Sequence, residues 1–164
     1  MKPLRHVIFL ALFLVCGVVL AQDKRISCEL LKSIDLKPLL GKDHDAPVPF
    51  GKAACRVESK APGRLVILTV EEESPEEIKN FMAMVKRVST QERAQEVVVT
   101  AEPALGPEAF SVREKGEQRQ VELYAVKGTR SVVIRATWAV GSPISDAVFK
   151  QLQGVTQAVL AKLP

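Results

Sequence analysis

The chain has 164 residues, of which 47% are hydrophobic, 26% are charged and 5% are aromatic, and its formal net charge is +4. These values are ordinary for a single globular domain, and they exclude collagen-like, low-complexity and multi-pass membrane chains. The length also excludes a large enzyme of two domains.

The first segment has the pattern of an export signal. Two basic residues, Lys2 and Arg5, precede an uninterrupted apolar run of 14 residues from Val7 to Leu20. A helix that spans a membrane needs about 20 apolar residues, so this run is short for a span and typical of the hydrophobic region of a signal peptide. We therefore predict a signal peptide over residues 1–21.

Cleavage is predicted after Ala21, because Val19 and Ala21 are both small enough for the signal peptidase. The predicted mature chain, residues 22–164, is one domain with 21 basic and 19 acidic residues, which is a net charge of +2. It has no block of Lys and Arg, so nucleic acid is not expected as a partner. Two alternatives stay open. In the first, the segment is not cleaved and anchors the domain in a membrane. In the second, Cys16 is lipidated, although Val15 is large for the position before such a cysteine.

The predicted mature chain contains two cysteines, Cys28 and Cys55, which are 27 residues apart. An isolated pair in an exported protein usually forms a disulfide. A redox-active pair would more often be a C-x-x-C motif, and a metal site would need ligands beyond His44, the one histidine that remains after cleavage. We predict a structural disulfide between Cys28 and Cys55, with no metal ion and no cofactor.

Two short helical pieces are expected at the start of this domain. Residues Cys28 to Leu31 can form a turn, and Asp35 can cap a second helix in which Pro38 falls in the first turn and Gly41 follows the last. Residues 42–52 contain prolines and mixed charges and are predicted to form a loop.

A hairpin and a long helix should follow. The predicted strands are Cys55–Ser59 and Leu65–Val70, joined by a turn at 61–63, and the second strand is apolar on both faces, as in a strand covered on both sides. Ser74-Pro75-Glu76-Glu77 has the sequence of a capping box with Pro at the first helical position. Core residues then recur at helical spacing: Ile78, Phe81, Met82, Val85 and Val88.

The second half of the sequence is predicted to form four strands and a C-terminal helix. The strands are Val97–Val99, Ala109–Arg113, Val121–Val126 and Val132–Trp138, with tight turns between the last three. Alternation pairs Phe110 with Leu123 and Val121 with Ala136, on one apolar face that comprises Phe110, Val112, Val121, Leu123, Ala125, Val132, Ile134, Ala136 and Trp138. The helix should begin after Ser142-Pro143 and bury Ile144, Val148, Leu152, Val155, Val159 and Leu163.

The order of these pieces resembles a group of small secreted bacterial proteins of unknown function, many of which are lipoproteins. Three features carry the resemblance: the Cys28-Glu29-Leu30-Leu31 start with its short helix, the single later Cys55, and the 105–110 step, Leu-Gly-Pro-Glu-Ala-Phe, before the hairpins and the last helix. The resemblance implies an α+β fold like that of PsbP, an α/β/α sandwich in which helices pack against an antiparallel sheet. It supplies no catalytic residue, and fold similarity alone does not give function.

Groups able to perform chemistry are few. A catalytic triad would have to use His44, which lies between Asp43 and Asp45 in a predicted loop, and these three residues form an incomplete metal shell. The acidic residues Glu71 to Glu73, with Glu76 and Glu77, surround a predicted helix N-terminus, where the helix dipole favours carboxylates. We therefore predict no catalytic residue.

One surface is a candidate for binding. The sheet face opposite the apolar stripe should carry Arg113, Glu122, Tyr124, Arg135 and Thr137, with Glu122 facing Arg135 across the strands. We expect a non-enzymatic accessory or binding domain, secreted or periplasmic, with an unknown envelope protein or small ligand as its partner and no permanent membrane span after cleavage. The alternatives are a secreted hydrolase with an unrecognised site and a membrane-anchored envelope protein.

Overall fold

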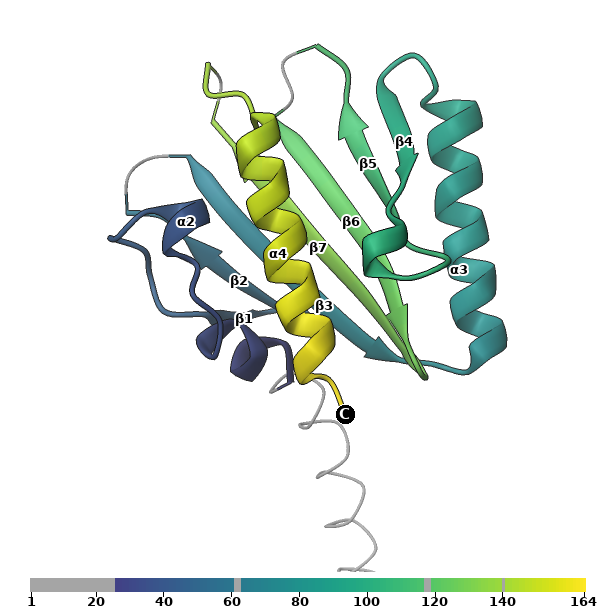
Figure 1. Ribbon diagram of the computed structural model, residues 1–164, viewed down its shortest axis with the longest axis horizontal. Coiled ribbons are helices and arrows are strands. Elements are labelled where there is room, and N and C mark those ends of the chain that lie inside the picture. The colour runs from purple at the N-terminus through teal and green to yellow at the C-terminus, as the bar shows by residue number, and fades with distance from the viewer. Residues whose placement is uncertain (1–25, 61–62, 117–118, 140) are drawn as a thin grey trace, which may run out of the picture.

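The computed structural model describes residues 26–60, 63–116, 119–139 and 141–164. Within these ranges the chain forms a seven-stranded antiparallel sheet in the order β1-β2-β3-β7-β6-β5-β4, with helices packed on it (Figure 1). The predicted α+β class is therefore confirmed. The predicted signal peptide, its cleavage site and Cys16 lie outside the described residues, as do residues 61–62 of the predicted turn.

The elements follow one another as a small N-terminal hairpin region, a central helix and a C-terminal meander. The strands are β1 (Val48–Phe50), β2 (Ala54–Glu58), β3 (Arg64–Glu72), β4 (Val97–Ala101), β5 (Phe110–Glu114), β6 (Gln120–Lys127) and β7 (Arg130–Trp138). The helices are residues 26–32, here called helix 26–32, then α2 (Lys37–Leu40), α3 (Pro75–Arg87) with a π-helical turn η1 (Val88–Glu92), the short η2 (Pro103–Leu105) and α4 (Asp146–Lys162).

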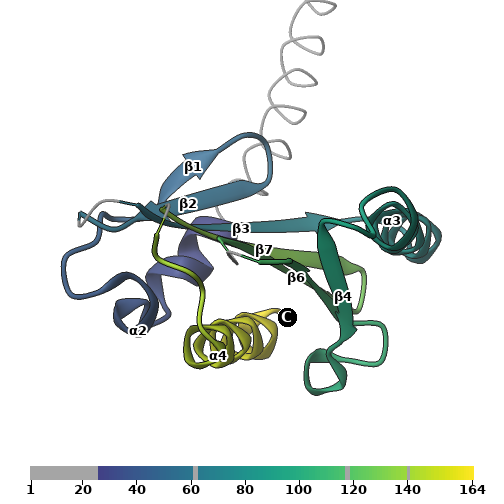
Figure 2. The same cartoon turned by 90° about the horizontal axis from the view of Figure 1, so that it is seen from above.

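The larger core lies between α4 and one face of the sheet. Leu152 and Val159 of α4 are fully buried against alternating residues of β3, β6 and β7, among them Leu68, Leu123 and Ile134, which are also 0% exposed. Helix 26–32 and α2 add their leucines to the same cluster. Figure 2 shows α2 and α4 on the same side of the sheet.

A second, smaller core lies on the opposite face, where α3 packs. Ile78 and Met82 of α3 contact a cluster with Val97, Phe110 and Tyr124 of the outer strands. The predicted capping box starts this helix: the Glu77 amide donates to Ser74 Oγ at 3.3 Å, and the Ser74 amide donates to Glu77 Oε2 at 2.9 Å. The sheet therefore has apolar residues on both faces, and β6 contributes to both cores, with Leu123 in the larger and Tyr124 in the smaller.

This second core corrects the predicted register of β5. Phe110 pairs with Tyr124, and Ser111 pairs with Leu123, which is one residue away from the prediction, whereas the predicted pair Val121 and Ala136 is confirmed. Because side chains alternate between faces, the shift places Phe110 on the α3 side of the sheet rather than on the α4 side. Val112 moves with it, into the second core.

Three further predictions are wrong in part. Residues 42–52 include strand β1, which pairs with β2. Helix α4 begins at Asp146 with Ser145 as its cap, three residues later than predicted. Only one face of β3 is fully covered: Val66 is buried, whereas Leu65 and Ile67 on the other face are partly exposed.

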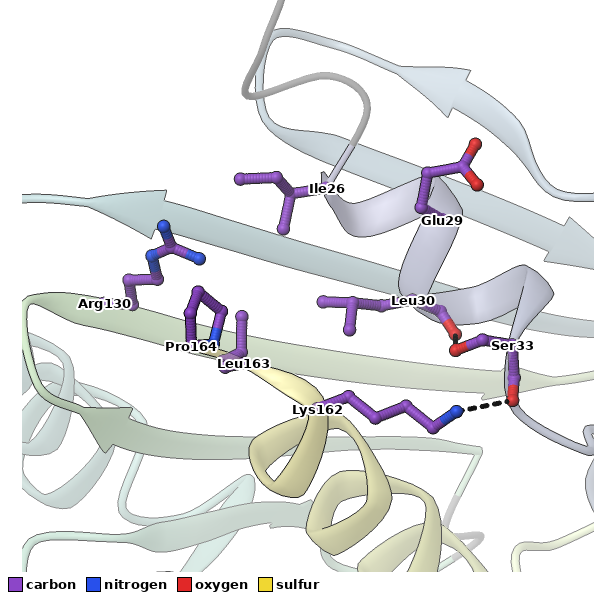
Figure 3. Close-up of a pocket in the computed structure, with 8 residues that line it drawn as sticks. All are labelled: Ile26, Glu29, Leu30, Ser33, Arg130, Lys162, Leu163 and Pro164. Carbon is purple, nitrogen blue, oxygen red and sulfur yellow. Dashed lines mark hydrogen bonds between the residues drawn. The ribbon is translucent and has the colours of Figure 1, made fainter.

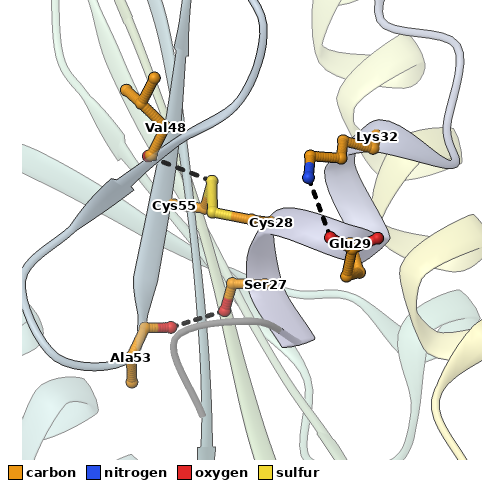
Figure 4. Close-up of a disulfide and its surroundings, with 7 residues drawn as sticks. All are labelled: Ser27, Cys28, Glu29, Lys32, Val48, Ala53 and Cys55. Carbon is orange, nitrogen blue, oxygen red and sulfur yellow. Dashed lines mark hydrogen bonds and ion pairs between the residues drawn. A yellow bond between two sulfur atoms is a disulfide. The ribbon is translucent and has the colours of Figure 1, made fainter. Parts of the chain in front are cut away.

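The predicted disulfide between Cys28 and Cys55 is confirmed, with a Cα–Cα distance of 5.1 Å (Figure 4). It fastens helix 26–32 to β2, and both cysteines are buried. The Ser27 hydroxyl donates to the Ala53 carbonyl oxygen at 2.5 Å beside it. Cys55 Sγ also lies 3.1 Å from the Val48 carbonyl oxygen, as a close contact, because a disulfide sulfur has no proton to donate.

Candidate functional site

The predicted binding face is divided between the two sides of the sheet. Glu122, Tyr124, Arg135 and Thr137 share the side away from α4, but the register of β5 turns Arg113 toward α4. There the Arg113 guanidinium lies 4.5 Å from the centroid of the Phe149 ring and donates to Asp146 Oδ1 at 3.0 Å. The structure thus brings four of the five residues onto one side.

The centre of this group is a buried carboxylate. Glu122 is 6% exposed and accepts hydrogen bonds from the Tyr124 hydroxyl at 2.5 Å, from Arg135 Nε at 2.6 Å and from Gln120 Nε2 at 3.1 Å. Burial of a charge is tolerated when it is paired and hydrogen-bonded in this way. The Glu122 cluster, defined as these four residues, is therefore satisfied within the fold.

The Tyr124 side chain is buried and does not form part of a binding surface. Its ring stacks on Phe110 at a centroid distance of 4.8 Å, and only 6% of the residue is exposed. Burial, together with the hydrogen bond to Glu122 and the charge of Glu122, raises the pKa of Tyr124 above the usual tyrosine range. Of the predicted face, Arg135 is exposed and Thr137 is partly exposed, so the outer surface is smaller and less aromatic than expected.

A second buried carboxylate, Glu102, has a structural position. It is 5% exposed, accepts from Ser111 Oγ at 2.7 Å and from Gln153 Nε2 at 2.6 Å, and so connects the start of η2 to β5 and α4. These bonds occupy the carboxylate from two elements and leave it inside the protein.

The acidic and histidine motifs are also engaged locally. His44 Nδ1 lies 3.0 Å from the Asp45 carbonyl oxygen, and His44 forms an isolated bridge with Ser59. Glu72 pairs with Arg130 across β3 and β7. In the parts of the chain that the structure describes, no group of three or more His, Cys, Asp or Glu side chains is placed to hold a metal ion.

A hollow with mostly apolar walls lies where helix 26–32, the end of α4 and the start of β7 meet (Figure 3). This end pocket has a volume of about 420 Å³. Four of its lining residues are apolar or nearly so and four are polar or charged: Ile26, Leu30, Leu163 and Pro164, then Glu29, Ser33, Arg130 and Lys162.

The walls of the end pocket come from distant parts of the chain and are held by specific bonds. Lys162 Nζ donates to the Ser33 carbonyl oxygen at 3.1 Å, which joins α4 to the turn after helix 26–32. Lys127 Nζ donates to the carbonyl oxygens of Leu160 and Leu163 at 2.6 and 2.7 Å, where α4 ends. A cation is favoured at a helix C-terminus, where carbonyl groups lack intrahelical partners.

The charges around the end pocket favour an anion. Glu29, the one carboxylate among its described lining side chains, pairs with Lys32 at 2.9 Å. Arg130 contacts Glu72 at 3.6 Å, and the Arg130 side chain is 16% exposed. A distance of 3.6 Å is an ion pair but exceeds a hydrogen bond, so guanidinium donors remain for a ligand.

A second hollow, of about 330 Å³, lies at the opposite end of β3 and β7. Its lining is more polar and includes Thr137 of the predicted face. The lining residues are Glu58, Ser59, Gly63, Arg64, Leu65, Thr137, Trp138 and Ala139. The Arg64 guanidinium lies 5.9 Å from the Trp138 ring centroid and donates to the Leu39 carbonyl oxygen. Because these contacts engage its aromatic and its cation, we take the end pocket as the candidate site.

Sequence reasoning missed the end pocket altogether. Leu163 was expected in the buried stripe of the last helix, and Leu30 in a helical turn, but no local pattern indicated that they border the same hollow. The signal that exists is the basic residue Lys162 in the last turn of an amphipathic helix, and this pattern is too common to indicate a site.

No protein-family model, no curated protein and no solved structure matches this chain. In the part of the chain that the structure describes, no helix is long and apolar enough to cross a membrane.

Proposed function

We propose that this chain is an exported, non-enzymatic binding domain of the cell envelope or the surrounding medium, and that its ligand occupies the end pocket. The observation that carries the proposal is the pocket itself, whose volume of about 420 Å³ and apolar walls suit a small organic molecule. Ligand sites are typically concave, mostly apolar and provided with a few polar groups that orient the ligand.

Export is supported by two features. The first is the short apolar run from Val7 to Leu20 after two basic residues. The second is the buried disulfide between Cys28 and Cys55, a bond that is stable in oxidising compartments and rare in reducing ones. Kinship with the group of small secreted bacterial proteins belongs to the same proposal.

Export is tested by the mass of the protein recovered from the envelope or the medium. The expected mass is that of a chain starting at Gln22, less the two hydrogen atoms lost when the disulfide forms. A chain that retains residues 1–20, or two thiols that react with a labelling reagent without reduction, would contradict the proposal.

Binding is tested with a library of uncharged small organic molecules and amide-resolved NMR of the mature chain. Shift changes should cluster in helix 26–32 and at the end of α4. The variant Ile26→Trp should fill the pocket and abolish them, whereas Met84→Trp adds the same side chain at an exposed position of α3 and should not. Changes scattered over the surface, or an undiminished response in Ile26→Trp, would refute the site.

The non-enzymatic part of the proposal has its own test. His44 lies beside the Asp45 carbonyl and outside the end pocket. We expect His44→Ala to fold normally and to keep whatever biological activity the parent protein has. Loss of that activity in a folded His44→Ala variant would favour the hydrolase alternative instead.

A further inference from the structure

The end pocket has an apolar side and a cationic side. Figure 3 shows Ile26, Leu30, Leu163 and Pro164 around the hollow, with the Arg130 guanidinium at its edge. Lys162 extends along the pocket away from Arg130, toward Ser33. An elongated ligand could therefore lie on hydrocarbon along most of its length and meet a guanidinium at one end.

Arg130 is the side chain best placed to bind a charged end group. It is mostly buried, and its contact with Glu72 is 3.6 Å long to a carboxylate whose side chain is 57% exposed. Water around the Glu72 carboxylate screens its attraction to Arg130. A guanidinium carries five N–H donors in a planar fork, which matches the two oxygens of a carboxylate.

The other charged side chains that line the pocket, Lys162 and Glu29, are compatible with this preference. Lys162 donates to a carbonyl oxygen, which is uncharged, so this hydrogen bond does not neutralise the lysine. Glu29 lines the pocket, but its carboxylate pairs at 2.9 Å with Lys32, which is not a lining residue. A positive end group would be repelled by Arg130 at one end of the pocket or by Lys162 at the other, whereas an anion is complementary to either cation.

Resting on the proposed function, we propose that the end pocket binds a free single-chain carboxylate. Its hydrocarbon chain lies against Ile26, Leu30 and Leu163, and its carboxylate accepts hydrogen bonds from Arg130. A chain of intermediate length is favoured, because the pocket is open and, among the described residues, three apolar side chains and one proline bound it. Binding is reversible and makes no covalent bond.

The test is calorimetric titration of the untagged mature chain with octanoate, decanoate and dodecanoate, each below its micelle concentration. Affinity should rise about twofold to fourfold for each added methylene group that finds apolar wall, and then level off. Decanol and decyltrimethylammonium, which share the ten-carbon chain, should bind at least tenfold more weakly than decanoate, because they lack the charged hydrogen bonds.

Variants separate the charge from the shape of the site. Arg130→Gln should weaken decanoate about tenfold or more and leave decanol unchanged, and Arg130→Lys should lose less, because it keeps the charge without the fork. Arg87→Gln at the exposed end of α3 is the matched control and should have no effect. A melting curve confirms that each variant is folded; if Arg130→Gln is not folded, the Arg130→Lys result and the comparison with decanol decide.

The outcomes distinguish this inference from the proposed function. Equal affinity for decanoate and decanol, with both lost in Ile26→Trp, would overturn the carboxylate and keep a binding pocket. No binding of any of these probes, while uncharged molecules still shift helix 26–32, would also overturn the carboxylate alone. Sedimentation with phosphatidylglycerol vesicles that depends on Arg130, without binding of free decanoate, would assign the cation to a membrane surface and overturn the free ligand.

Discussion

Reduction of the disulfide should destabilise the domain strongly and should loosen helix 26–32 first. The bond between Cys28 and Cys55 closes a loop of 27 residues. In the chain-entropy model, a loop of this size contributes about 3.5 kcal/mol to the free energy of unfolding. For a domain of this length, that loss lowers the melting temperature by about 10–15 °C.

The effect should be local before it is global. Without the bond, helix 26–32 is held by the Ser27 hydroxyl on the Ala53 carbonyl, by the Lys162 contact to Ser33 and by its buried leucines. All of these remaining contacts are noncovalent. Amide hydrogen exchange should therefore increase in residues 26–33 and β2 under conditions where α4 stays protected. Because three lining residues of the end pocket lie on helix 26–32, affinity for pocket ligands should fall as well.

The assay compares melting curves with and without reductant for the parent protein and for the double variant Cys28→Ala/Cys55→Ala. The double variant removes both sulfurs and therefore serves as the matched control: reductant should leave its melting temperature unchanged. If reductant lowers the melting temperature of both proteins equally, the effect is unrelated to this bond. If the reduced parent melts within about 2 °C of the oxidised protein, the loop-entropy argument is wrong for this chain.

Three smaller predictions concern single side chains. Tyr124 is the one tyrosine of the chain, so tyrosinate absorbance reports on it alone. Its raised pKa keeps the hydroxyl protonated in the native protein above about pH 10, where the tyrosine of the unfolded chain ionises. The free energy of unfolding should therefore fall as the pH rises above that value. Absorbance that rises at about pH 10 while circular dichroism still reports a native fold would contradict the burial of this hydroxyl. Ser74→Ala should lower the free energy of unfolding by about 1 kcal/mol in a urea titration, because α3 loses its cap. Leu152→Ala, at a fully buried position of α4, should cost about 2–5 kcal/mol in the same titration, and a cost below 1 kcal/mol would place this helix face outside the core.

Local signals predicted most of the elements, because the forces behind them act within a few residues. The capping box at Ser74, the Pro at the start of α3 and the alternation in β6 and β7 each depend on neighbours along the chain. The disulfide was predictable for a different reason: once residues 1–21 are set aside, Cys28 and Cys55 are the only pair left. Neither argument required knowledge of how the elements pack.

The errors occur where tertiary contacts choose between equivalent local patterns. Ser142 and Ser145 can both cap a helix, and the structure uses Ser145, whose hydroxyl accepts from the Val148 amide at 3.3 Å. Strand β1 has three exposed residues and a proline in its middle, so its place in the sheet depends on pairing with β2 rather than on its own sequence. Propensity alone ranks such segments as loops.

The one-residue shift of β5 explains why the candidate site lies elsewhere than expected. Alternation within β5 shows that Phe110 and Val112 share a face, but it does not show which face, and the prediction assumed one apolar core. Because α3 builds a second core, these residues turn toward it and help to bury Tyr124, which closes the surface that was expected to bind a partner. Joint replacement of Tyr124 and Arg135 should therefore unfold the domain rather than leave it folded and unable to bind. A binding function then has to be sought where side chains from distant elements leave a hollow, and the end pocket between helix 26–32, α4 and β7 is such a place.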